Sequence, residues 1–165
     1  MKLFNLAALL VAALTLAACS NPRAGMIDDS GPRDGIATTA LGDPSDPTSI
    51  AHFNQRVGDR VHFVTDSSEL SGEARSILRA QAAWLGNNPQ YQVLIEGHAD
   101  ERGPREYNVA LGARRADAVE RFLTQEGVQR GRLRTVSYGK ERPVEACPEQ
   151  RCWDQNRRAV TVVSR

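Results

Sequence analysis

One loop near the middle of the chain decides how the fold is organised: IEGHADERGPREYN, residues 95–108. Before it, residues 91–95 carry the β-branched and aromatic side chains that are typical of a strand. After it, Pro104 stands where prolines commonly open helices, and a helical pattern then continues to Phe122. The sequence therefore predicts that a charged loop connects a central strand to a long helix.

One face of this long helix carries an arginine among apolar side chains. At the 3.6-residue period, the face contains Asn108, Leu111, Arg115, Ala118, Val119 and Phe122. Arg115 therefore lies within the apolar stripe, whereas its neighbour Arg114 points to water. An unpaired buried charge is very costly, so Arg115 needs an acidic partner or an anionic ligand, and Asp100 is the natural candidate. A purely structural Asp100–Arg115 pair, or an arginine that extends to the helix edge, are alternatives.

Residues 55–165 contain further strand and helix patterns on both sides of the central strand, loop and helix, and together they predict one domain. Strands are expected at 60–64, 92–97, 132–137 and 158–163, and helices at 72–85 and 104–125, the first of them capped by Ser71. The order βαβαββ predicts a two-layer α/β sandwich, an α+β arrangement. Its sheet should be mixed, because two strands joined by a helical crossover pair in parallel. Trp84 is expected to be buried or half-buried in the core.

The first 54 residues are expected to precede the folded domain. Residues 1–18 contain Lys2 and an apolar run too short to span a bilayer, which predicts a signal peptide. Leu16-Ala17-Ala18-Cys19 resembles a bacterial lipobox, which implies that Cys19 becomes a lipidated N-terminus. The Ser20 that follows implies sorting to the outer membrane. Residues 19–54 are rich in Gly, Pro, Asp, Ser and Thr, which predicts a disordered, flexible linker.

Charge and cysteine content narrow the class of protein further. Removing residues 1–18 takes away Lys2 and no acidic residue, so that 20 basic residues balance 20 acidic ones. A neutral chain without a basic run argues against a nucleic-acid partner. With Cys19 assigned to lipid, Cys147 and Cys152 form an even pair, and an oxidising compartment favours a disulfide between them. Trp153 is expected to pack over that disulfide loop. The cysteine spacing is a weak match to a metal site.

Residues 58–164 resemble the OmpA-like peptidoglycan-binding domain family in several separate blocks, and the blocks occur in the expected order. They are Gly97–Gly103, Glu106–Asn108, Leu111–Gly112, Arg114–Ala116, Val136–Glu141 and Asn156–Val160. The resemblance implies that Asp100 and Arg115 grip the diaminopimelate side chain of the peptidoglycan stem peptide. A zwitterionic terminus of that kind suits one carboxylate and one guanidinium. The predicted site also includes Asp66 and Ala99, the residues Tyr107 and Asn108 that begin the helix beside the loop and, near the start of the last strand, Arg158 as a second cation, with neither metal nor cofactor.

Two functions from different classes follow from this resemblance. The first is a non-catalytic tether, lipid-anchored in the outer membrane, whose periplasmic domain binds peptidoglycan. It implies TolB and other Tol components as partners in a system that supports envelope integrity and cell division. The second is a periplasmic cell-wall-modifying enzyme with the same recognition pocket. The sequence favours the tether, since no G-x-S-x-G nucleophile motif or other catalytic constellation accompanies the pocket residues.

Overall fold

The structure, a computed structural model, describes residues 41–165. The predicted signal peptide at 1–18, the predicted lipidation site Cys19 and residues 20–40 of the predicted linker lie outside the described residues. Within residues 41–165, no helix is long and apolar enough to cross a membrane.

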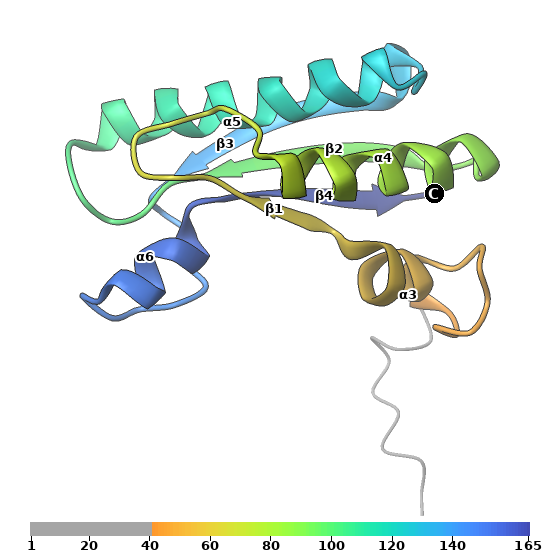
Figure 1. Cartoon of the computed structure of the whole chain (residues 1–165), viewed down its shortest axis with the longest axis horizontal. Coiled ribbons are helices and arrows are strands. Elements are labelled where there is room, and N and C mark those ends of the chain that lie inside the picture. Colours follow the sequence, from red (N-terminus) through yellow and green to blue (C-terminus); the bar gives the residue numbers. More distant parts are fainter. Residues whose placement is uncertain (1–40) are drawn as a thin grey trace, which may run out of the picture. The chain divides into compact units, whose positions relative to one another are not determined.

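Four strands form one mixed sheet (Figure 1). Along the chain they are β1 (Arg60–His62), β2 (Gln92–His98), β3 (Leu133–Gly139) and β4 (Arg158–Ser164), and they lie in the order β1-β4-β2-β3. β2 runs parallel to β3 and antiparallel to β4, and β1 is antiparallel to β4. The helix between β2 and β3 makes the crossover, which confirms the predicted parallel pair and the predicted mixed sheet.

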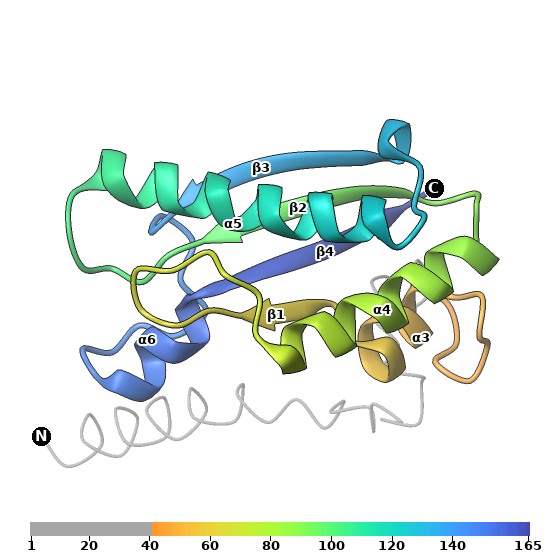
Figure 2. The ribbon, with the colours of Figure 1, turned by 45° about the horizontal axis from the view of Figure 1, so that its top comes forward.

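Two long helices, α4 (Gly72–Asn87) and α5 (Arg105–Gln125), cover the same face of the sheet (Figures 1 and 2). The predicted two-layer α/β sandwich is therefore confirmed. The Ser71 hydroxyl caps α4 by accepting a hydrogen bond from the backbone N–H of Ala74 at 3.1 Å, as predicted. The core between the two layers includes Val61, Leu78, Leu85, Val93, Ile95, Val119, Leu123, Leu133 and Val163.

Two glycines allow α5 to lie directly on the sheet. A Cβ atom added to Gly97 of β2 would come within 1.8 Å of the Gly112 carbonyl oxygen on α5. A Cβ atom added to Gly112 would come within 2.4 Å of the Ser137 hydroxyl and 2.8 Å of the Gly97 carbonyl oxygen. This close backbone contact fixes the N-terminal half of α5, and with it the loop that precedes the helix.

The folded domain begins earlier than the predicted boundary at residue 55. Residues 41–58, which we call the N-terminal strap, contain α3 (Ile50–His52) and the π-helical turn η1 (Phe53–Gly58). Phe53 is fully buried, with its ring centroid 4.8 Å from that of Trp84. The Trp84 indole N–H donates to the Pro47 carbonyl at 2.7 Å. Residues 41–54, which the composition assigned to the linker, are therefore part of the domain because their apolar and carbonyl groups complete its core.

A short helix that the sequence did not predict, α6 (Gln150–Asn156), lies between β3 and β4. A one-turn 3-10 helix, η2 (Arg130–Arg132), precedes β3. Cys147 and Cys152 are joined by a disulfide, with their Cα atoms 5.8 Å apart. Figures 1 and 2 place α6 at the end of the sheet where β2 ends and β4 begins.

Candidate functional site

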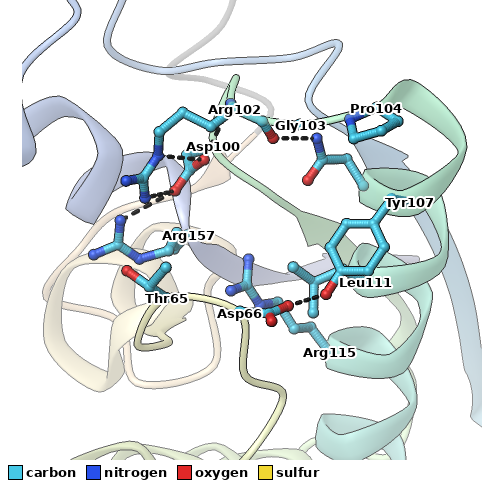
Figure 3. A pocket seen from close by; sticks show the side chains of 11 residues that line it. Thr65, Asp66, Asp100, Arg102, Gly103, Pro104, Tyr107, Leu111, Arg115 and Arg157 are labelled. Atoms are coloured by element: carbon cyan, nitrogen blue, oxygen red, sulfur yellow. Dashed lines mark hydrogen bonds and ion pairs between the residues drawn. The ribbon is translucent and has the colours of Figure 1, made fainter.

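An open cavity of about 410 Å³ lies at the end of the sheet where β2 ends and β4 begins. Its walls come from the loop after β1, the loop between β2 and α5, the first turns of α5 and the residue before β4 (Figure 3). The lining residues are Thr65, Asp66, Asp100, Arg102, Gly103, Pro104, Tyr107, Asn108, Leu111, Arg115 and Arg157. Of the residues that the sequence implicated, five are brought together here: Asp66, Asp100, Tyr107, Asn108 and Arg115.

The carboxylate of Asp100 is buried and is held between two guanidinium groups (Figure 3). Arg102 donates to it from Nη2 at 2.7 Å and from Nε at 3.1 Å, and Arg157 donates from Nη1 at 3.2 Å. Burial alone raises the pKa of Asp100, but the hydrogen bonds from Arg102 and Arg157 outweigh it, so the pKa is lowered. The group is therefore an anion with two charge-assisted partners at neutral pH.

Arg115 is fully buried, and its guanidinium binds backbone carbonyl groups rather than a carboxylate. Nη1 donates to the His98 carbonyl at 2.7 Å, Nε to Ser67 at 2.8 Å and Nη2 to Val64 at 3.2 Å. The predicted direct Asp100–Arg115 ion pair is therefore wrong, because three carbonyls satisfy the buried charge. Burial and the nearby Arg157 charge lower the pKa of Arg115 to about 10, which still leaves it charged at neutral pH.

The second cation of the site is Arg157, where the sequence had implicated its neighbour Arg158. Arg157 is buried, donates to the Phe63 carbonyl at 3.1 Å and forms ion pairs with Asp100 and Asp154. Arg158 does not line the cavity. Its guanidinium donates instead to the Arg142 carbonyl at 3.2 Å, so the predicted role of Arg158 in the pocket is wrong.

The opposite wall of the cavity combines an aromatic ring with a second carboxylate. The Tyr107 hydroxyl donates to the Asp66 carboxylate, and this bond raises the pKa of Tyr107. Asp66 has a φ of 55°, a left-handed conformation that aspartate tolerates better than most residues. The Asn108 side chain donates to the Arg102 carbonyl at 2.7 Å and so ties the loop to α5. Ala99 is buried beside the site but is not in the cavity wall.

This arrangement can hold a ligand that carries both signs of charge. Three guanidinium groups and two carboxylates meet at one cavity. Each guanidinium has five N–H donors, and Arg115 and Arg157 each use three in the hydrogen bonds described above, which leaves others for a ligand carboxylate. The oxygens of Asp66 and Asp100 can accept from an ammonium group. Within residues 41–165, no group of three or more His, Cys, Asp or Glu side chains is placed to hold a metal ion.

Comparison with known proteins identifies the family to which the chain belongs. Residues 62–158 match the model of the OmpA family. The chain is 48% identical over 156 residues to the peptidoglycan-associated lipoprotein of Mesorhizobium japonicum, covering 94% of this chain and 89% of that protein. It is 55% identical over 118 residues to the Brucella melitensis peptidoglycan-associated lipoprotein, covering 72% of this chain and 70% of that one.

Solved structures agree with this assignment. The crystal structure of the peptidoglycan-associated lipoprotein from Burkholderia pseudomallei is 40% identical, with a TM-score of 0.65 over 74% of this chain and all of that one. The C-terminal domain of Helicobacter pylori MotB shares the fold, with a TM-score of 0.61 at 21% identity over 65% of this chain and 84% of that one. The chain therefore belongs to the OmpA family and, within it, to the peptidoglycan-associated lipoproteins.

Proposed function

We propose that this protein is a lipid-anchored tether whose C-terminal domain binds peptidoglycan without modifying it. The observation that carries the proposal is the cavity in which Asp100 is held by Arg102 and Arg157 beside the buried Arg115. The names of the relatives support it, since proteins 48% and 55% identical are peptidoglycan-associated lipoproteins.

The proposed ligand is the zwitterionic end of the diaminopimelate side chain in the stem peptide. Its ammonium group would be bound by the Asp100 and Asp66 carboxylates. Its carboxylate would be bound by the remaining N–H groups of Arg102, Arg115 and Arg157. Charge-assisted bonds of this kind contribute about 1.5–3 kcal/mol each, so losing one group weakens binding strongly.

The proposed anchor lies in the N-terminal part of the sequence. Residues 1–18 act as a signal peptide, Cys19 carries the lipid, and the linker that follows reaches the folded domain. Ser20 directs the lipoprotein to the outer membrane, so the domain faces the periplasm. The proposal extends to the Tol system, with TolB and other Tol components as partners in envelope integrity and cell division.

Retention on purified sacculi tests the binding proposal and separates it from the enzyme alternative. The parent should sediment with sacculi, free meso-diaminopimelate should compete, and no soluble wall fragments should be released. Asp100→Ala should lose retention, whereas Arg114→Ala should keep it, because Arg114 is exposed and outside the cavity wall. A folded Asp100→Ala variant that binds like the parent would contradict the proposed site, and released fragments would indicate an enzyme.

Fractionation tests the proposed anchor independently of the pocket. The parent should remain with the outer membrane after a salt wash, and Cys19→Ser should move to the soluble periplasmic fraction. If Cys19→Ser stays with the outer membrane, the lipid-anchor proposal is incorrect.

A further inference from the structure

Two side chains of α6 lie behind the arginines that bind Asp100. The Arg102 guanidinium carbon lies 4.1 Å from the centroid of the Trp153 ring. The Trp153 indole N–H donates to the Glu101 carboxylate, in the residue before Arg102. On the other side, Arg157 forms an ion pair with Asp154. Each guanidinium partner of Asp100 therefore also contacts a side chain of α6.

These supports matter because long side chains lose conformational freedom when they are held in one position. The Arg102 side chain is 40% exposed, so its contact with Asp100 alone leaves it free to exchange with water. Stacking on an indole ring fixes the plane of a guanidinium and adds a favourable cation–π contact. Trp153 and Asp154 contact Arg102 and Arg157 in the arrangement about Asp100 that Figure 3 shows, and so restrain both guanidinium groups there.

The position of α6 in turn depends on a small number of bonds. A helix of seven residues is too short to be stable without tertiary contacts. The disulfide attaches α6 at Cys152, which is buried, to Cys147 in the preceding loop. At the other end, the Asn156 side chain accepts from the Val144 N–H at 2.9 Å and donates to the Glu145 carbonyl at 2.8 Å.

We propose that Trp153 and Asp154 are positioning residues for the pocket, and that the Cys147–Cys152 disulfide makes its ligand affinity dependent on thiol redox state. This inference rests on the proposed function of the cavity as a ligand site. A dithiol reduces the disulfide by transferring two electrons and two protons. The S–S bond breaks, Cys147 and Cys152 become thiols, and the dithiol closes to a cyclic disulfide. α6 then loses its covalent link to the preceding loop while the sheet and core stay intact.

Linkage between ligand and disulfide tests this proposal without any substitution. The full chain, purified in detergent, is equilibrated in dithiothreitol redox buffers with and without saturating L-Ala-D-Glu-meso-diaminopimelate. Thiol alkylation and mass measurement give the reduced fraction. If reduction weakens peptide binding, the peptide must make the disulfide harder to reduce by the same factor. We expect a factor of about 5 or more, the lower end of typical couplings between sites. An unchanged reduction midpoint, with equal peptide affinity of both forms, would overturn the redox coupling.

Substitutions in α6 test the positioning residues separately. Trp153→Ala and Asp154→Asn should each weaken peptide binding about 5-fold or more, whereas Trp153→Phe, which keeps a ring for Arg102, should stay within about 2-fold. Arg151→Ala is the matched control, because Arg151 is an exposed α6 residue paired with Glu149. Asp154 is half exposed, so Asp154→Asn is expected to fold like the parent, and far-UV circular dichroism checks each variant.

The outcomes distinguish this inference from the proposed function beneath it. A parent protein that does not bind the peptide would contradict the proposed function. A parent that binds, together with folded Trp153→Ala and Asp154→Asn variants of equal affinity, would contradict only the role of α6.

Discussion

Replacing Arg115 by lysine should destabilise the domain strongly even though the charge is kept. The guanidinium of Arg115 donates to three carbonyls, those of Val64, Ser67 and His98. Val64 and Ser67 belong to the loop after β1, and His98 ends β2, so one ammonium group cannot reach all three. Two charge-assisted hydrogen bonds are lost at about 1.5–3 kcal/mol each. Because Val64 and Ser67 lie in a loop that is not buried, water can solvate their carbonyls, and we expect the lower end, about 3 kcal/mol.

A loss of this size is large against the total stability of a domain, which is about 5–15 kcal/mol. Urea unfolding of the full chain, followed by circular dichroism, measures it. Arg114→Lys is the matched control, because Arg114 is the exposed neighbour on the same helix and should change stability by less than about 0.5 kcal/mol. If the free energy of unfolding of Arg115→Lys lies within about 0.5 kcal/mol of the parent value, the three carbonyl contacts do not stabilise the fold.

Three further predictions concern a buried histidine, a close glycine contact and the disulfide. Burial, Arg158 and Arg142 lower the pKa of His98 to about 4, so stability should fall by up to about 3 kcal/mol as the pH drops from 6.5 to 4. His98→Leu should flatten that pH dependence in urea titrations at pH 7 and pH 4.5, because leucine has no group that titrates. The replacement breaks no hydrogen bond, since neither ring nitrogen of His98 has a hydrogen-bond partner among residues 41–165. Gly97→Ala should lower the melting temperature sharply, at a cost of about 3 kcal/mol, whereas Gly86→Ala, with open space around its added Cβ, should raise it slightly. Cys147→Ala with Cys152→Ala should still give cooperative unfolding with a loss of about 2 kcal/mol or less, because the sequence separation is only 5 residues.

Periodicity placed Arg115 correctly but gave the wrong partner for it. The helical pattern put Arg115 on the core-facing side of α5 and Arg114 in water, as the structure has them. It could not indicate that carbonyls from 17 to 51 residues away in the chain would gather around the guanidinium. Backbone carbonyls carry no sequence signal, so an acidic side chain was the only partner visible in the sequence.

Strand alternation contained the information that selects Arg157 over Arg158. Side chains of a strand alternate between faces, and Ala159 and Val163 of β4 are buried in the core beneath the helices. Arg157 lies two residues before Ala159 and six before Val163, so its side chain points to the same, helix-covered side, where the cavity lies. Arg158 lies on the other face of the strand with Val160 and Val162, and Val162 is 39% exposed. The family block Asn156–Val160 contains both arginines, and the strand alternation shows which of the two faces the cavity.

Composition assigned the N-terminal strap to the linker because most of its residues are polar. Its few apolar residues, however, pack into the core of the domain. Pro44, Pro47 and several Asp, Ser and Thr residues make residues 41–49 look like linker. In the structure, Asp43 and Asp46 accept hydrogen bonds from the N–H groups of Ser45 and Thr48, which forms two successive turns. Those turns bring Phe53 to the core, a long-range consequence that local composition does not record.

The position of the strap has a mechanical consequence. The Tyr91 hydroxyl, just before β2, donates to the Thr48 carbonyl at 2.8 Å, so the strap lies where β2 begins. The cavity lies at the other end, where Asp100 follows β2 and Arg157 precedes β4. A pull between the strap and a ligand in the cavity therefore acts along the strands. Hydrogen bonds between antiparallel strands run across that direction, so such a load shears many of them together instead of opening them one after another. The sheet is thus aligned to resist extension along the line from strap to cavity.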